Sequence, residues 1–440
     1  GNRGGAEGGG CHDKGRGDDS GGEEPHAPSF TRAGRPDIGE TPGSYGIVTK
    51  STPSPHEQAR IAPSDGAMGR YAAPVQSPVL FDATPLGRDH AARGIGAAVR
   101  GMAEALAMRP DGERPAFLVA GDGVEAPLTP ERYHVPWRDW RVRHVPDPQP
   151  AARIARKVRD LSPQLFHATQ PDLLPSGVPT VVTLYDLIPA AYPRLFLRGG
   201  RHAAESRAYR KWMSRLPQAE LLLCISQETA DDAVRLAGVD RERTRVIPLA
   251  CPPIAIPSGS VPDDPYILMS GGLEPHKNPW PVISALAMLP EPLRLVMTGP
   301  WGGRRMRIVR DYAHKAGVLD RVDMLGHVSA ERLAALREGA QAVVVPSLKE
   351  GFGLPVLEAL TVGVPVVASD TQALREVGGD AVRYEDPFDA SAWADAIAEA
   401  WQEPAIKRAA QFGGPSRAKQ FSWEKTSLQI LEAYHEVLHR

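Results

Sequence analysis

The sequence predicts an α/β protein with two domains, each built around a doubly wound parallel sheet. Short apolar runs, such as 221–226 and the β-branched run 342–345, alternate with helical segments at the spacing typical of such sheets. Their continuous apolar character indicates strands covered on both faces. A chain of 440 residues is long for one core. The proline-rich segment 253–265, which separates two series of these runs, is therefore the predicted linker.

Composition and charge narrow the class of protein. A net charge of −2 gives no whole-chain argument for a nucleic-acid partner. The three cysteines, Cys11, Cys224 and Cys251, are too few and too scattered for a disulfide framework or a metal site, and they favour a reducing compartment. No apolar run is long enough to span a bilayer, and the first residues lack the pattern of a signal peptide. We therefore expect a cytoplasmic protein.

Residues 1–76 differ from the rest of the chain. They are rich in Gly, Pro, Ser and charged residues and show no sustained apolar period, which predicts a disordered extension. The sequence leaves open whether this segment is a regulatory or partner-binding tail, a dispensable one, or the product of a misplaced start codon.

The first domain is expected to span 77–252. A strand at 78–82 is followed by Gly94, Gly96 and a helix at 97–107, the order of a nucleotide-phosphate site, although a tight connection has the same pattern. The further predicted elements are strands at 116–120, 141–145, 165–168, 180–186, 221–226 and 244–250 and a helix at 151–161.

Polar residues stand at the ends of two of these strands. His167 follows one strand, and Tyr185 and Asp186 follow another. Ligands of doubly wound sheets bind at the carboxyl ends of the strands, so all three are candidate site residues. His167 fits a core position equally well, and Asp186 fits a turn or a helix cap.

The segment 198–215 carries six basic residues around Tyr209 and Trp212. Its basic face suits an anionic membrane surface or a phosphorylated acceptor, and a solvated helix face is the alternative.

The second domain is expected to span 266–420, before a terminal amphipathic helix at 421–440. Its first strand ends at Gly271 and Gly272, and Lys277 follows one turn later. A cation beside a glycine-rich strand end is suited to neutralise a diphosphate.

The stretch 342–370 carries the strongest functional pattern. Glu350 lies in the turn after a buried strand, where Gly351 and Gly353 let the backbone approach a ligand. Pro355 suits the first turn of the helix that follows. The N-terminus of that helix directs unpaired N–H groups at the turn, which makes it an anion site.

A second carboxylate, Glu358, is placed by its spacing on the first turn of this helix. Two carboxylates around a phosphate site suit a nucleotide sugar, with Glu350 on the sugar, the N–H groups of 351–354 on the sugar and phosphates, and Glu358 on the ribose diol. A plain turn with a helix-stabilising Glu is the alternative.

The stretch from Glu350 to Glu358, with Gly-Val-Pro-Val-Val-Ala-Ser-Asp370 after it, resembles the E-x-x-x-x-x-x-x-E signature of retaining glycosyltransferases of family 4. That family has the GT-B fold, in which two Rossmann-like domains face each other across a cleft. The resemblance covers about 78–440 and implies that the donor lies in the second domain and the acceptor mainly on the first. It also implies that the terminal helix crosses back onto the first domain.

Other segments resemble the family with departures. In 181–193 Tyr185 stands where the motif His-Asp-Leu-Ile-Pro has its His, which puts a His-based role in doubt but leaves the backbone carbonyl. In 271–278 Gly272 stands where an Arg is common and His276 where a second cation is usual, so Lys277 must carry more of the diphosphate charge. The segment 322–328 resembles the part on which the donor base stacks.

The resemblance therefore implies a site with three kinds of residue. The catalytic candidates are Glu350, Asp186 and Tyr185, and His167 is the acceptor-binding candidate. The donor-binding candidates are Gly94, Gly96, Gly272, Lys277, Gly299, Gly351, Phe352, Gly353, Leu354 and Glu358.

The implied reaction is hexosyl transfer from a nucleotide diphosphate sugar with retention, and it requires no metal and no other cofactor. The motifs look most like those of bacterial mannosyltransferases, so GDP-mannose is the first expected donor, with UDP-glucose, UDP-N-acetylglucosamine and dTDP-deoxysugars open. The acceptor is a polysaccharide, a lipid-linked glycan or a natural-product core, with at most peripheral membrane contact.

The alternatives are a GT-B nucleotide-sugar epimerase and a non-catalytic sugar-nucleotide-binding protein. A Rossmann dehydrogenase fits less well, because no Gly-x-Gly-x-x-Gly followed by a ribose-binding acid is present.

Overall fold

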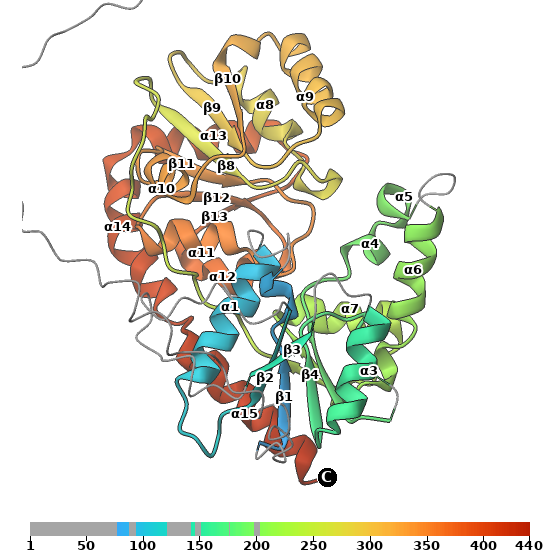
Figure 1. Cartoon of the computed structure of the whole chain (residues 1–440). Coiled ribbons are helices and arrows are strands. Elements are labelled where there is room, and N and C mark those ends of the chain that lie inside the picture. Colours follow the sequence, from blue (N-terminus) through green and yellow to red (C-terminus); the bar gives the residue numbers. More distant parts are fainter. Residues whose placement is uncertain (1–76, 88–93, 121–141, 146–150, 176, 198–202) are drawn as a thin grey trace, which may run out of the picture. The chain divides into compact units, whose positions relative to one another are not determined.

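The computed structural model describes residues 77–87, 94–120, 142–145, 151–175, 177–197 and 203–440 (Figure 1). These residues form two parallel sheets, of seven and six strands, and both sheets belong to one compact unit. The predicted α/β class with two doubly wound sheets is thus confirmed. The extension 1–76, with Cys11, lies outside the described residues, so its predicted disorder stays a prediction.

The first sheet has the strand order β3-β2-β1-β4-β5-β6-β7, with every neighbouring pair parallel. The chain leaves the central pair β1 and β4 in opposite directions across the sheet, which is the doubly wound arrangement. The strands are β1 Val79–Asp82, β2 Ala116–Ala120, β3 Val142–Val145, β4 Leu165–Ala168, β5 Thr180–Leu184, β6 Leu221–Cys224 and β7 Thr244–Val246.

Helices connect these strands where the sequence favours them. The α-helices are α1 Gly94–Ala107, α3 Ala151–Leu161, α4 Ile188–Ala191, α5 Pro193–Phe196, α6 Ala203–Met213 and α7 Gln227–Ala237. Ser226 caps α7, because its Oγ accepts a hydrogen bond of 3.1 Å from the N–H of Thr229. Helix α1 begins three residues earlier than predicted, so Gly94 and Gly96 lie in its first turn and do not precede it.

Three predicted strands of the first sheet end earlier in the structure. The predicted strand 180–186 ends at Leu184, because the Oδ1 of Asp186 accepts the N–H of Ile188 at 3.0 Å and starts the short helix α4. The predicted strand 221–226 ends at Cys224, and the predicted strand 244–250 ends at Val246.

The second sheet repeats the same plan, with the order β10-β9-β8-β11-β12-β13 and parallel pairing throughout. Its strands are β8 Tyr266–Ser270, β9 Arg294–Thr298, β10 Val322–Gly326, β11 Ala342–Val345, β12 Val366–Ser369 and β13 Arg383–Glu385. Its helices are α8 Trp280–Leu286, α9 Gly303–Lys315, α10 Ala330–Glu338, α11 Leu354–Thr361, α12 Gln372–Gly378, α13 Ala390–Gln402 and α14 Pro404–Ala418. The chain between β7 and β8 contains neither helix nor strand.

The last helix, α15 Trp423–Leu438, packs back against α1 and the first sheet (Figure 1). The indole of Trp423 lies on Gly101, and its Nε1 donates a hydrogen bond of 3.1 Å to the carbonyl of Cys251. Tyr434 reaches the buried interior of the first sheet. None of the helices in the described part of the chain has the length and apolar character needed to cross a membrane.

The contact between Gly101 and Trp423 allows the packing of α15 against α1 to be tested. A Cβ at position 101 would lie 2.2 Å from the indole ring, which its hydrogen bond to Cys251 holds in place. We expect Gly101→Ala to lower the free energy of unfolding by about 1–3 kcal/mol in denaturant titrations. Gly112→Ala is the matched control, because nothing lies within 4 Å of a Cβ there. Equal stability of the two variants would contradict the packing.

Candidate active site

The loops that follow β8 and β11 begin at the point where the second sheet reverses its strand order. These two strands are neighbours, and the chain continues from them to opposite edges of the sheet. Crevices form outside such switch points, and ligands of doubly wound sheets bind there. The loop after β8 carries Lys277 and the loop after β11 carries Glu350, so the topology brings together two residues that are 73 positions apart in the sequence.

Glu350 and Lys277 form a largely buried ion pair. Lys277 Nζ donates to Glu350 Oε1 at 2.8 Å, and the hydroxyl of Ser347 donates to the same oxygen at 2.6 Å. Burial raises the pKa of the Glu350 carboxyl, but the Lys277 ammonium and the hydrogen bonds outweigh burial and lower the pKa below its usual value. Glu350 therefore stays ionised. Ser347 is not among the residues predicted from the sequence, although it lies only three residues before Glu350 in the same loop.

Gly351 brings this loop against the end of β5 in the first sheet. A Cβ at position 351 would lie 2.2 Å from the carbonyl oxygen of Tyr185 and 3.2 Å from the Cβ of Asp186. Only a residue without a side chain allows so close an approach. Three catalytic candidates, Glu350, Tyr185 and Asp186, are thereby gathered in one place.

Helix α11 begins directly behind these residues. Gly353 precedes it at φ +112°, a backbone conformation that side chains disfavour, and no side chain caps the helix. Pro355 lies in its first turn, as predicted. The backbone N–H groups at this N-terminus therefore keep the character of an anion site.

Glu358 does not lie on the first turn of α11, as its spacing predicted. The helix begins at Leu354, so Glu358 is its fifth residue and stands on the second turn. Its carboxylate forms an ion pair with Arg337 of α10. Burial raises the pKa of Glu358, and Arg337 opposes that effect only in part. Contact with a ribose stays a prediction for Glu358.

At the end of β5, Tyr185 contributes its backbone carbonyl and Asp186 its carboxylate to the candidate site. The Tyr185 ring is buried, burial raises the pKa of its hydroxyl, and no described group forms a hydrogen bond with that hydroxyl. The Oδ1 of Asp186 accepts the N–H of Ile188 in a turn at the start of α4, which is the turn role that the sequence left open. Burial also raises the pKa of Asp186, and the nearby Glu350 carboxylate raises it further.

The glycines at the ends of β8 and β9 allow close backbone contacts. Gly299 has φ +145°, and a Cβ there would lie 1.7 Å from the carbonyl oxygen of Gly271. A Cβ on Gly272 would lie 1.9 Å from the Oε2 of Glu274, so this carboxylate occupies the space that a side chain at 272 would need. His276 is buried, and burial together with Lys277 lowers its pKa to about 4. His276 therefore adds no positive charge at neutral pH.

The other donor-binding candidates lie around α11. Phe352 is buried, and its ring meets the ring of Phe421 edge-on, with 5.8 Å between the ring centroids. Leu354 is half-buried, and its Cδ1 lies 3.8 Å from where a Cβ on Gly94 would be. The starts of α1 and α11 thus approach each other. Gly94 is exposed, whereas Gly96 is buried within α1.

The structure places His167 in the core and not at a site surface. Its side chain has no exposed area, and both ring nitrogens are within hydrogen-bond distance of hydroxyls, Nδ1 at 2.6 Å from Tyr434 and Nε2 at 2.7 Å from Thr183. Burial lowers its pKa to about 3. The acceptor-binding prediction for His167 is therefore corrected in favour of the core alternative, because Tyr434 of α15 and Thr183 of β5 enclose its ring in the core.

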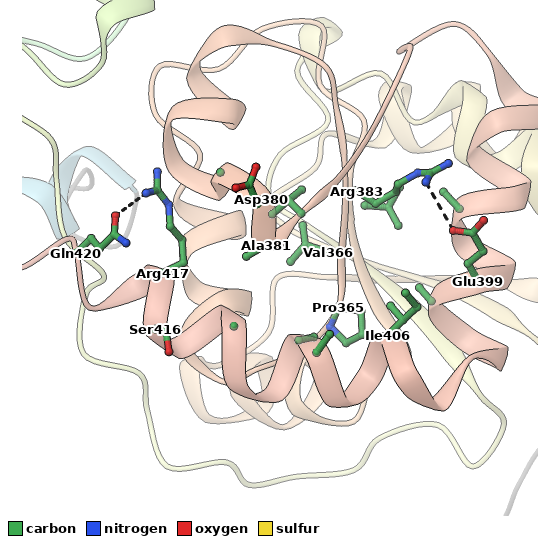
Figure 2. A pocket seen from close by; sticks show the side chains of 18 residues that line it. Pro365, Val366, Asp380, Ala381, Arg383, Glu399, Ile406, Ser416, Arg417 and Gln420 are labelled. Carbon is green, nitrogen blue, oxygen red and sulfur yellow. Dashed lines mark hydrogen bonds and ion pairs between the residues drawn. The ribbon is translucent and has the colours of Figure 1, made fainter.

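A separate hollow of about 700 Å³ lies between β12, β13, α13 and α14. Arg383, Glu399, Arg417 and Gln420 are among its lining residues (Figure 2). None of the candidate site residues lines it. Among the described residues, no group of three or more His, Cys, Asp or Glu side chains is placed to hold a metal ion.

Comparison with known families accounts for both halves of the described chain. Residues 92–252 match the family described as Glycosyltransferase Family 4, and residues 254–418 match the family described as Glycosyl transferases group 1. The chain belongs to these glycosyltransferases. The boundary between the two matches falls in the segment between β7 and β8, and the second match contains both Lys277 and Glu350.

Two curated relatives show how far the similarity extends. The chain is 33% identical over 234 residues to the O-antigen chain mannosyltransferase B of Escherichia coli, which covers 50% of this chain and 61% of that protein. It is 32% identical over 242 residues to a D-inositol 3-phosphate glycosyltransferase of Xylanimonas cellulosilytica, covering 50% of this chain and 58% of that protein. The chain thus spans about three fifths of the length of these relatives.

Solved structures share the fold. Sucrose-phosphate synthase from Thermosynechococcus elongatus superposes with a TM-score of 0.64 at 20% identity, covering 82% of this chain and 99% of that one. Anabaena HepE in complex with UDP and glucose superposes with a TM-score of 0.62 at 20% identity, covering 81% and 99%. The predicted GT-B fold is confirmed by these neighbours together with the two sheets.

The core position of His167 is open to a direct test. Replacing its ring leaves the hydroxyls of Tyr434 and Thr183 without their partner inside the core, so we expect His167→Leu to lower the free energy of unfolding by about 2–3 kcal/mol. His435→Leu, at an exposed position of α15, is the matched control and should stay within about 0.5 kcal/mol of the parent. An unchanged unfolding curve for His167→Leu would contradict the core assignment.

His276 gives a pH dependence with a defined sign. The unfolded chain protonates this ring near pH 6.5, whereas the folded protein does so only near pH 4. The unfolded state therefore binds more protons between these values, and stability falls as the pH drops from 6.5 to 4. We expect His276→Asn to flatten this part of the stability profile measured by denaturant unfolding across pH. If the profiles of His276→Asn and the parent protein ran parallel, His276 would titrate in the folded protein as it does in the unfolded chain, and the expectation would be wrong.

Proposed function

We propose that this chain is a hexosyltransferase that moves a sugar from a nucleoside diphosphate sugar to an acceptor hydroxyl with retention at the anomeric carbon. The observation that carries the proposal is the position of the Lys277–Glu350 pair, which lies beside the uncapped N-terminus of α11 and one residue from the contact between Gly351 and Tyr185. This arrangement offers positive potential to a diphosphate and oxygen atoms to a sugar in one place.

The donor side of the proposed reaction rests on Lys277 and α11. When the bond between the anomeric carbon and the diphosphate oxygen breaks, negative charge develops on the leaving diphosphate. An ammonium and the backbone N–H groups of a helix N-terminus stabilise such a charge without reorganising. We propose that Lys277 and these N–H groups take the place of a divalent cation. Glu350 holds Lys277 in place and accepts hydrogen bonds from the sugar.

The acceptor side rests on the end of β5. In the proposed step the acceptor oxygen attacks from the face that the diphosphate leaves, and its proton passes to the leaving phosphate oxygen. The carbonyl oxygen of Tyr185 stabilises the positive charge that develops on the sugar, and Asp186 positions the acceptor hydroxyl. The Tyr185 hydroxyl takes no part as an acid or base, because burial raises its pKa.

The donor is proposed to be GDP-mannose. Support comes from the similarity to a protein named as a mannosyltransferase, while a structural neighbour was solved with UDP and glucose. The acceptor is proposed to be a saccharide hydroxyl on a polysaccharide, a lipid-linked glycan or a natural product. Helix α6 exposes Arg207, Arg210 and Lys211, which supports peripheral contact with an anionic membrane that carries such an acceptor.

The proposal is tested first by binding. Thermal unfolding of the full chain is measured with GDP, UDP, dTDP and ADP, since a ligand that binds only the folded state raises the melting temperature. We expect one nucleotide to raise it by about 2–5 °C at saturating concentration. Lys277→Met should remove most of this shift, whereas Lys315→Met, at an exposed position of α9, should keep it. No shift with any nucleotide would overturn the proposal.

Turnover of the sugar nucleotide that this panel selects then separates an enzyme from a binding protein. Glu350→Gln keeps the shape of the side chain but loses its charge, and we expect it to lower kcat at least about 100-fold. The exposed Glu338→Gln is the matched control. A parent protein that binds nucleotide and turns nothing over with added saccharides would be a binding protein, and release of free sugar without an acceptor would indicate a hydrolysing epimerase.

A further inference from the structure

Helices α7 and α12 each cap the other's N-terminus with a glutamate. The carboxylate of Glu376 on α12 accepts hydrogen bonds from the N–H of Gln227 at 2.7 Å and of Glu228 at 3.1 Å, at the start of α7. The carboxylate of Glu228 accepts the N–H of Ala373 at 2.9 Å, at the start of α12. Because α7 follows β6 and α12 follows β12, this exchange joins the two sheets.

Lys349 adds a buried cation to the same place. Its Nζ pairs with Glu228 and lies 2.9 Å from the Oδ2 of Asp232, one turn further along α7. The side chains of Lys349, Glu228 and Asp232 are 10%, 14% and 4% exposed. Burial lowers the pKa of Lys349, but the two carboxylates outweigh burial and raise it, so the ammonium stays charged. We call these three residues the Lys349 triad.

The triad acts on the candidate active site through its neighbours in the sequence. Lys349 directly precedes Glu350, and on α7 Glu228 directly precedes Thr229. The hydroxyl of Thr229 lies 3.3 Å from the carbonyl oxygens of both Tyr185 and Gly351. The triad therefore joins the loop that carries Glu350 to the helix that contacts the end of β5.

Stability alone is a poor reason to bury such a triad. Desolvating three charged groups costs free energy that their mutual attraction only partly returns. Well-packed apolar residues of similar volume would stabilise the fold at least as well. A buried charged group does, however, have one favourable geometry, which makes it suited to hold two elements in a defined position.

We propose that Lys349 is a positioning residue, which through Glu228 and Asp232 holds Glu350 and Gly351 against the Tyr185–Asp186 strand end. This inference rests on the proposed function. Nucleotide binding rests on Lys277 and the N-terminus of α11, whereas transfer also requires the sugar contacted by Glu350 to be aligned with the acceptor side. Loss of the triad should therefore lower kcat much more than it lowers nucleotide affinity.

The test compares Lys349→Met with Arg241→Met. Arg241 lies between α7 and β7 and pairs with Asp231 of α7, so this control also removes a salt bridge of α7. Both partners of that salt bridge belong to the part of the chain that forms the first sheet. We expect Lys349→Met to lower kcat about 10–100-fold, with the dissociation constant of the nucleotide within about 3-fold of the parent. Glu228→Gln is a milder change and should lower kcat by a smaller factor, again with nearly unchanged nucleotide affinity. The double variant Lys349→Met/Glu228→Gln should be no worse than Lys349→Met alone, because both changes remove one interaction.

Hydrogen exchange on the nucleotide-free protein gives a readout that does not need activity. Amides of 226–232, 347–353 and 372–376 should exchange faster in Lys349→Met than in Arg241→Met. Unchanged exchange would overturn the inference even if no nucleotide binds and the proposed function itself has failed. An unchanged kcat per folded molecule would overturn it while the proposed function stands. Weakened nucleotide binding with an unchanged kcat would make Lys349 a donor-binding residue and would also overturn it.

Discussion

The close approach of Gly351 to the carbonyl oxygen of Tyr185 is the constraint on which the candidate site depends. It brings the loop after β11 into contact with the end of β5, so that groups from two separate sheets share one small volume. Any side chain at position 351 would hold these backbones apart. The glycine therefore serves the contact between the sheets and not only a local turn, and the neighbouring Glu350 and Asp186 take their positions from it.

Charge at the site is arranged in pairs that cross from one element to another. Lys277 and Glu350 join the loops after β8 and β11, and Lys349 joins the loop after β11 to α7. The Lys349 ammonium keeps its charge although it is largely buried, because two carboxylates lie close to it and raise its pKa. Isolated charges at these positions would be expensive, and paired charges with a single good geometry define where the loops lie.

The terminal helix α15 takes part in the core of the first sheet. The hydroxyl of its Tyr434 lies 2.6 Å from Nδ1 of His167 on β4, and the hydroxyl of Thr183 on β5 lies 2.7 Å from Nε2, so this ring is enclosed in the core. The end of β5 instead meets the loop after β11, where Gly351 approaches the carbonyl oxygen of Tyr185. Polar residues on two neighbouring strands thus have different surroundings, one in the core and the other at the candidate active site.

The sequence by itself determined the two doubly wound sheets, most strand positions and the places of Lys277 and Glu350 after strand ends, because these follow from local apolar patterns and from glycine and proline signals. It also determined the family through the Glu350–Glu358 stretch. Only the tertiary structure decided that His167 belongs to the core, because packing places Tyr434 of α15 and Thr183 of β5 against its ring. It also decided the roles of Thr229 and Lys349, because their partners lie on loops and helices that are distant in the sequence and that no local pattern connects to them.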